Sequence, residues 1–443
     1  MAGETSMNVT VRSPQTAAEQ AVTDQFEAVA GILPGTGAVR SVREAAIRRF
    51  ANEGLPHRRI EEWKYTDLRA KLREIPAPAK AGDAPIGADV LSEVDTWRIV
   101  IVDGGEPRLP AGLVEQGVTV ARQSESLEAG TLDGAWAEGT ESALFDLNTA
   151  FVATGVSVHV PENVHLDKPI QIACVTTAPK AASVYLRNRV DVGAGGSATV
   201  VESYEGPDGI GYVVNSASKL SAARDASLTW VKVQRDGDTA FHFATVDSRV
   251  EQGGRLIVAP FTTGAALSRT NLAIAFGGEH AEAVLAGVQL LGDRQHGDTT
   301  LFVDHALPHG DSRELFKAVV DGEARSVFQG KIIVRQDAQK VDGKMMTQAL
   351  MLSERAEIDN KPELEIYADD VQCGHGATSG RIDEDLLFYL RARGIPEQVA
   401  KGLLIEAFVG EAIEAIGNEA IGEALSTLTR AWVTRHAVTG EAS

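Results

Sequence analysis

The pattern of hydrophobic and polar positions divides the 443-residue chain into three regions. In the first, apolar residues recur every three or four positions in "PQTAAEQAVTDQFEAVAGIL" and "AVRSVREAAIRRFANEG", which predicts two amphipathic helices. The second helix is expected to end at Gly54. A linker rich in Ala, Pro and Gly, "EIPAPAKAGDAPIGA", follows. We therefore assign an N-terminal helical region and linker to residues 1–95.

From about Thr96 the pattern changes to short β runs separated by Gly, Asp and Asn, such as "WRIVIVDG" and "ASVYLRNRVDV". These runs repeat: "GSATVVE", "DASLTWV", "GGRLIVA" and "HAEAVLA" begin at residues 196, 225, 253 and 280, at offsets of 29, 28 and 27. Beyond them the register is hard to follow. A small or polar corner before each β run is typical of a solenoid, whose stacked units share one core. A β-sandwich would lack this longer period. The sequence therefore predicts a β-helix over residues 96–372.

After the strand "KPELEIYA" and a turn containing a cysteine and a histidine, helical spacing returns. One helix stops at Gly394, and Pro396 opens "PEQVAKGLLIEAFVGEAIEAIG". The apolar stripe of this second helix comprises Leu403, Leu404, Ala407, Phe408 and Ile413. Such a stripe either packs onto the end of the solenoid and caps its open edge, or docks a partner. A last helix, "EALSTLTRAWVTRH", completes a predicted C-terminal helical domain at residues 373–443.

Charge and composition exclude several classes of protein. The formal net charge is −20 and there is no basic run, so phosphate backbones and anionic lipids repel the chain, and neither nucleic acid nor a membrane surface is expected as a partner. The first thirty residues lack the apolar region of a secretory signal, and no run of eighteen apolar residues occurs. Two cysteines are too few for a disulfide framework. We expect a cytoplasmic protein.

The common catalytic motifs are missing. The sequence contains no G-x-x-x-x-G-K-[ST], H-E-x-x-H, C-x-x-C or G-x-S-x-G pattern, and "GAGGSA" near Gly193 lacks the third glycine of a dinucleotide fingerprint. The chain is therefore not expected to hydrolyse nucleotides through a P-loop.

Histidines and acids gather in "RQHGDTTLFVDHALPHGD". The group consists of His296, His305, His309, Asp298, Asp304 and Asp311. It could serve as a metal or acid–base cluster, but Pro308 prevents the helical spacing that would aim His305 and His309 at one ion. A structural role is the favoured interpretation.

The two cysteines differ in context. Cys174 lies in the apolar run "IQIACVTT" and is interpreted as a small core residue. Cys373 and His375 form a C-x-H pattern which, if extended, puts both side chains on one face of the chain. Thiolate and imidazole suit iron or zinc, yet two ligands are half a tetrahedral site. The rest would come from other histidines, water or another polypeptide. A tight turn with an incidental thiol is an equally weighted alternative.

The surrounding segment, "NKPELEIYADDVQCGHGATSGRIDEDLLFYLRARGIPEQVAKGLLIEAF", resembles the C-terminal signature of the SufB/SufD family of iron–sulfur cluster assembly proteins. The resemblance continues upstream through "VDHALPHGDSRELFKAVVDGEARSVFQGKIIVRQDAQKVDGKMMTQALMLSERAEID". "PHRRIEEWKYTDLR" and "FDLNTAFVATGVSVHVPENV" resemble the SufD branch, and the low cysteine content points the same way.

The resemblance implies a right-handed parallel β-helix between N-terminal and C-terminal helical domains. It also implies a non-catalytic, SufD-like subunit of the SufBCD scaffold that pairs with SufB through the β-helices and contributes to iron entry. The C-terminal helices would dock the SufC ATPase, to which ATP hydrolysis belongs, with Leu403, Leu404 and Phe408 as candidate contacts. A transient iron–sulfur cluster would be shared with SufB, and the isolated chain would hold none stably.

By position, His375 matches the family's interface histidine and Cys373 its neighbouring thiol, with the missing ligands supplied by SufB. Many relatives carry lysine and serine where this chain has Gln372 and Gly374. Because a nearby cation lowers a thiol pKa, its loss makes Cys373 the weaker candidate. The acids Asp369 and Asp370 are interpreted as a strand-ending turn rather than as iron-capturing groups.

Three alternatives remain open. A SufB-like scaffold would accept sulfur itself, but this needs a thiol relay, for which Cys174 alone is a poor basis. A β-helix carbohydrate-active enzyme would need a secretion signal and an aromatic groove, and the aromatic content is 5%. A purely structural subunit, with Cys373 and His375 inert, would keep the same turn.

Overall fold

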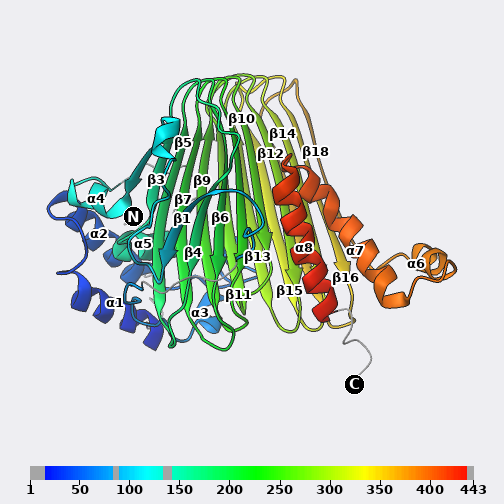
Figure 1. Cartoon of the computed structure of the whole chain (residues 1–443), viewed down its shortest axis with the longest axis horizontal. Coiled ribbons are helices and arrows are strands. Elements are labelled where there is room, and N and C mark those ends of the chain that lie inside the picture. The colour runs from blue at the N-terminus through cyan, green and yellow to red at the C-terminus, as the bar shows by residue number, and fades with distance from the viewer. Residues whose placement is uncertain (1–14, 83–88, 133–141, 437–443) are drawn as a thin grey trace, which may run out of the picture.

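A computed structural model describes residues 15–82, 89–132 and 142–436. Its centre is a flattened β-solenoid made of two nine-stranded sheets, and helices from both ends of the chain pack around it (Figure 1). The predicted β-helix between helical regions is confirmed.

From β3 onward, successive strands alternate between the two sheets. The first sheet contains β1 (Trp97–Val102), β4 (Ile170–Val175), β6 (Ser197–Glu205), β8 (Ser227–Arg235), β10 (Arg255–Thr262), β12 (Glu282–Leu291), β14 (Asp311–Val320), β16 (Asp342–Met351) and β18 (Gln372–Gly380). The second contains β17 (Glu357–Ile366), β15 (Arg325–Val334), β13 (His296–His305), β11 (Leu267–Phe276), β9 (Phe241–Val250), β7 (Val213–Ala222), β5 (Ser183–Val192), β3 (Val156–Val160) and β2 (Thr119–Arg122). Neighbouring strands pair in parallel, except that β2 pairs antiparallel with β3.

The repeat found in the sequence continues to the last strand. Glu282, Asp311, Asp342 and Gln372 occupy equivalent positions in β12, β14, β16 and β18, at offsets of 29, 31 and 30 residues. The corners between strands vary in length, and this variation conceals the period in the sequence beyond residue 280.

One corner of the solenoid uses a left-handed backbone in turn after turn. The positive-φ residues at this corner are Asn163, Gly195, Asp225, Gly253, His280, His309 and Lys340. Several of these residues donate their backbone N–H to a carbonyl of the next turn. Gly195 N–H donates to Arg224 O at 2.9 Å, and Lys340 N–H donates to Asp370 O at 2.7 Å. Gly, Asn and Asp adopt this conformation most readily, which explains the small or polar corner residues of the repeat.

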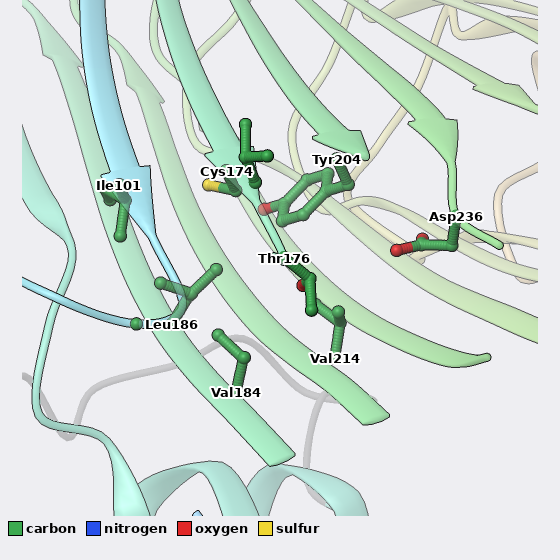
Figure 2. Close-up of a pocket in the computed structure, with 10 residues that line it drawn as sticks. Ile101, Cys174, Thr176, Val184, Leu186, Tyr204, Val214 and Asp236 are labelled. Carbon is green, nitrogen blue, oxygen red and sulfur yellow. The ribbon is translucent and has the colours of Figure 1, made fainter. Parts of the chain in front are cut away.

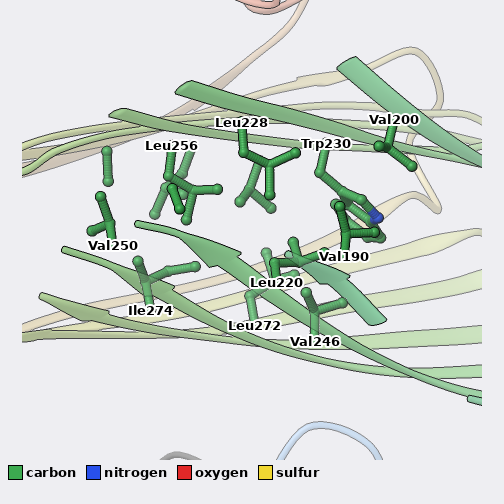
Figure 3. Close-up of a cluster of buried hydrophobic side chains, with 14 of the residues drawn as sticks. Val190, Val200, Leu220, Leu228, Trp230, Val246, Val250, Leu256, Leu272 and Ile274 are labelled. Atoms are coloured by element: carbon green, nitrogen blue, oxygen red, sulfur yellow. The ribbon is translucent and has the colours of Figure 1, made fainter. Parts of the chain in front are cut away.

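The space between the sheets, called the lumen here, is lined by the inward-facing residues of the strands. Val200, Leu228 and Trp230 of the first sheet face Leu220 and Val246 of the second (Figure 3). All five are at most 1% exposed. Burying one such aliphatic side chain contributes roughly 1.5–3 kcal/mol, so the stacked turns stabilise one another.

The N-terminal helices cover the outer face of the second sheet. They are α1 (Ala17–Val29), α2 (Ala38–Glu53), η1 (Glu61–Trp63), α3 (Leu68–Lys71) and α5 (Ala143–Phe151), while η2 (Val114–Gln116) and α4 (Gln123–Glu128) flank β2. Phe151 of α5 stacks on Tyr185 of β5 at 4.9 Å between ring centroids. As predicted, α2 ends before Gly54, which has φ +74°.

The C-terminal helices α6 (Glu384–Arg391), α7 (Glu397–Glu414) and α8 (Glu419–His436) follow the solenoid. The buried residues of α7 pack on the outer face of the first sheet, at β12 and β14. They are Ala400, Ile405, Val409, Ala412 and Ile413. The predicted stripe was partly right: Ile413 is buried and Phe408 packs against the same cluster, whereas Leu403 and Ala407 lie on the exposed side. The helices cover a sheet face and do not cap the edge of the solenoid (Figure 1).

The two ends of the lumen differ. At the N-terminal end, Val100 of β1 exchanges backbone hydrogen bonds with Arg108, and Leu113 and Val118 fill the space between the sheets. At the other end, β17 and β18 are edge strands. We call this second end the open end, because residues at its rim such as Tyr367 are 63% exposed.

The segment containing Cys373 forms a strand and not the turn that the sequence predicted. Its residues, "QCGHGATSG", include three glycines and few strand-forming side chains, so local propensity does not favour a strand. Parallel pairing with β16 determines the extended conformation. The solenoid therefore extends to Gly380, past residue 372 where the sequence analysis placed its end.

Candidate interface site at the open end

Cys373 and His375 lie on β18, opposite Gly343 and Met345 of β16. Because they are two residues apart on a strand, their side chains share one face and are spaced by about 7 Å. Cys373 is half-buried and packs against the lumen core, while His375 is exposed. The sequence analysis placed both side chains on one face only if the segment is extended, and β18 meets that condition.

The thiol of Cys373 lies beside Gly343 and Ser312 of the neighbouring strands. A Cβ atom placed on Gly343 would lie 3.6 Å from Cys373 Sγ and 3.4 Å from Ser312 Oγ, so these two groups approach each other closely across the glycine. Partial burial raises the pKa of the Cys373 thiol, and the nearby acids Asp342 and Glu314 add to this effect. The thiol is therefore protonated at neutral pH and must lose its proton to bind a metal.

Asp370 forms part of the corner that precedes β18. Its backbone N–H donates to Gln339 Oε1 at 3.0 Å, and its carboxylate accepts a hydrogen bond from Lys340 Nζ. These contacts agree with the turn role that the sequence indicated for this residue.

The three histidines of the second candidate cluster lie in separate environments. His296 Nε2 is 2.8 Å from Thr66 Oγ1 beneath the N-terminal segment, and His305 Nε2 is 3.0 Å from Ser312 Oγ in the lumen. His309 stacks on His280 at the corner, with ring centroids 4.5 Å apart. The group does not converge, so the structural interpretation is supported.

The acids of that cluster also have structural partners. Asp298 accepts from Arg269 Nη1 at 2.6 Å, and Asp304 accepts from Arg335 Nε at 2.8 Å. Asp311 lies 3.0 Å from Arg313 Nη2 at the start of β14.

Cys174 lies in the lumen far from the open end. It borders a small cavity with Tyr204 and Asp236, shown in Figure 2. Burial raises the pKa of its thiol well above the ordinary value, and Glu202 and Asp236 act in the same direction. The residue is a buried, protonated core thiol, in agreement with the sequence interpretation.

Within residues 15–82, 89–132 and 142–436, no three His, Cys, Asp or Glu side chains lie close enough together to hold a metal ion. In the described portion of this chain, Cys373 and His375 therefore have no third such side chain close enough to complete a group of three.

The residues predicted to dock an ATPase differ in exposure. Leu403 is 45% exposed and Leu404 is half-buried. Phe408 packs toward the solenoid, where Lys317 Nζ lies 4.5 Å from its ring centroid.

A larger apolar surface, which the sequence analysis missed, lies on α6. Leu386, Phe388 and Tyr389 are 52%, 73% and 53% exposed, and no residue of α6 is buried. The run "LLFYL" in the sequence indicates such a surface, because consecutive apolar residues occupy several faces of a helix and cannot all be buried on one side. Among the described helices, none is long and apolar enough to span a membrane.

Comparison with known families accounts for most of the chain. A family model described as "SUF system FeS cluster assembly, SufBD core domain" matches residues 174–408, which is more than half of the chain. A second, "SufBD protein N-terminal region", matches residues 18–74 and 103–172.

Similar proteins include the iron–sulfur cluster assembly protein SufD of Escherichia coli, 30% identical over 380 residues, covering 85% of this chain and 88% of the relative. A SufBD family protein of Synechocystis is 32% identical over 395 residues, covering 84% and 86%. The chloroplastic protein ABCI7 of Arabidopsis thaliana is 26% identical over 441 residues, covering 94% and 92%. The chain belongs to the SufB/SufD family of scaffold-type iron–sulfur cluster assembly proteins.

Proposed function

We propose that this protein is a SufD-like subunit of a SufBCD-type scaffold, and that a nascent cluster forms where its open end meets a SufB partner. The observation that supports this proposal is the position of Cys373 and His375, which lie on one face of an edge strand at the open end.

The open end is suited to pairing with a second β-helix. The outer edges of β17 and β18 present backbone N–H and C=O groups, which a further strand can pair. Apolar side chains lie beside these edges: Met346, Ile366 and Tyr367 are 39%, 42% and 63% exposed. A partner solenoid would bury them while extending both sheets.

The cluster is cargo in this proposal. A thiol and an imidazole bind iron, and each supplies one donor atom. The partner contributes the remaining ligands, so the cluster is transient and the isolated chain holds none stably. Contribution to iron entry fits the exposed imidazole of His375, which binds iron without first having to leave a buried site.

We place the docking surface for a SufC-type ATPase on α6 and the start of α7. It consists of Leu386, Phe388, Tyr389, Val399 and Leu403, each at least 45% exposed. ATP hydrolysis belongs to that partner, and this chain acts in the cytoplasm as a non-catalytic subunit.

A SufB-like, sulfur-accepting role is the second candidate, since the relatives are about equally distant at 26–32% identity. It would need a reactive thiol, and burial keeps Cys174 protonated. The structure therefore favours the SufD-like role. The family assignment argues against the carbohydrate-active alternative.

The test is anaerobic co-expression with SufB-type and SufC-type partners, measuring iron, sulfide and visible absorption per complex. His375→Ala is expected to leave the complex assembled on a sizing column and empty of cluster, with a smaller loss for Cys373→Ala. Thr378→Ala, an exposed residue on the opposite face of β18, is the matched control. Equal iron and sulfide in all four proteins would refute the shared site.

A further inference from the structure

Glu314 is an acidic residue inside the lumen, close to the open end. It lies on β14, where it pairs with Met345 of β16, and Met345 in turn pairs with His375 of β18. The three side chains thus occupy one inward-facing row, which runs from the exposed imidazole to a glutamate that is only 2% exposed.

The carboxyl group of Glu314 has no hydrogen-bond partner within the described part of the chain, at either oxygen. On the same strand, Ser312 Oγ lies 3.0 Å from His305 Nε2, and Arg313 Nη2 lies 3.0 Å from Asp342 Oδ2 on the outer side. Burial raises the pKa of Glu314 to about 8, with Asp311 adding to the effect and Ser312 and Arg313 opposing it. A fold that retains such a group does so at a cost in stability, which points to a ligand for the carboxylate.

Gly343 and Met345 of β16 lie between β18 at the open end and Glu314 on β14. Gly343 has no side chain, and a Cβ atom there would be in ordinary van der Waals contact with both Ser312 Oγ and Cys373 Sγ, so the thiol and the hydroxyl lie close together. The side chain between His375 and Glu314 is Met345, which is unbranched and has three rotatable bonds.

We propose that Glu314 is an inner carboxylate ligand for a ferrous ion that enters the lumen at the open end, past Cys373 and His375. This inference rests on the proposed function and adds to it a second, inner binding site for the ion. Two strand spacings, roughly 10 Å, separate Glu314 from His375, so the ion moves inward from one to the other.

The chemistry is a ligand exchange without any redox change. The carboxylic acid loses its proton to solvent, and the carboxylate oxygen binds the ferrous ion in place of one of its water ligands. Carboxylate oxygens are suitable donors for divalent iron, and a divalent cation in an apolar lumen requires an adjacent negative charge. Glu314 provides that charge only when the ion displaces its proton.

The test is anaerobic titration of the full-length chain with ferrous ion alone, by calorimetry in two buffers of different ionisation enthalpy. Glu314→Gln is expected to weaken one site at least tenfold and to release about one proton fewer per ion. Glu282→Gln, at an exposed carboxylate on the adjacent strand β12, is the matched control and is expected to behave as the native chain. Thermal unfolding of each variant verifies folding.

Unchanged affinity and proton release in Glu314→Gln would overturn the inner site. If His375→Ala and Cys373→Ala also leave the cluster content of the complex unchanged, the proposed function fails too. If those two variants lose cluster while Glu314→Gln binds iron normally, only the inner site is wrong.

Discussion

Thr66 Oγ1 lies 2.8 Å from Nε2 of His296, although 230 positions separate the two residues. The same hydroxyl also donates to Asp298, whose carboxylate is 2.6 Å from Arg269 Nη1. The Arg269 guanidinium in turn lies 3.8 Å from the ring centroid of Trp63. This buried network fixes the segment after α2 onto β11 and β13.

We expect Thr66→Val to lower the free energy of unfolding by about 2 kcal/mol, because it conserves volume but leaves His296 Nε2 without its partner and removes one hydrogen bond from Asp298. Urea denaturation measures the change. Thr119→Val, at an exposed position on β2, is the control and should change stability little. Equal stability of the two variants would show that the network does not hold the segment.

Acid should destabilise the fold before most carboxylates are protonated. Burial lowers the pKa of His242 and His305 to about 4 and that of His296 to about 3. The contribution of these three histidines to the free energy of unfolding is complete above pH 6.5. It is lost as pH falls toward 4, because in this range the unfolded chain takes up protons that the folded chain does not. Each group adds about 1.4 kcal/mol per pH unit in this window.

Denaturant midpoints between pH 7.5 and 5 test this expectation. His242→Gln should reduce the slope of unfolding free energy against pH by about a third between pH 6 and 5. His159→Gln, at an exposed site on β3, should leave the slope unchanged. A slope that is the same in all three proteins would contradict the assignment.

Glu314→Gln should stabilise the folded chain at neutral pH. The raised pKa means that the folded state retains a proton which the unfolded state loses as pH rises from 4.5 to about 8, so the native protein loses stability across that range. The variant is expected to be more stable by about 3 kcal/mol at pH 7 and equal near pH 4. Lower stability of the variant at pH 7 would mean that the carboxylate has a structural partner.

The exposed surface of α6 should be dispensable for folding and required for ATPase docking. Phe388→Asp is expected to leave the unfolding free energy within about 0.5 kcal/mol, since the side chain is 73% exposed. Co-purification of the SufC-type partner should fall sharply. Glu384→Ala, on the same helix, is a suitable control, and equal ATPase recovery from both would exclude this surface.

Much of the architecture follows from local signals. The spacing of about 28 residues, with a small or polar corner before each β run, predicts the solenoid because each turn must repeat the same left-handed corner. The separation of His296 from His305 also follows, because nine positions apart on one strand places them on opposite faces.

Other features depend on contacts that no local pattern carries. The strand β18 forms from "QCGHGATSG" only because β16 offers an edge to pair with. The face that α7 buries depends on where β12 and β14 lie. Glu314 resembles a surface acid until the register of β14 places it in an apolar interior.

The difference between the two ends of the solenoid limits the stoichiometry of any assembly built by strand addition. A unit with two free ends would polymerise into a filament, as each added copy would offer a new edge. Here the exchange of backbone hydrogen bonds between Val100 and Arg108, with Leu113 filling the interior, covers the edge of the first sheet at one end. If strand addition is confined to the open end, as the proposed pairing requires, growth stops after a single partner has been added.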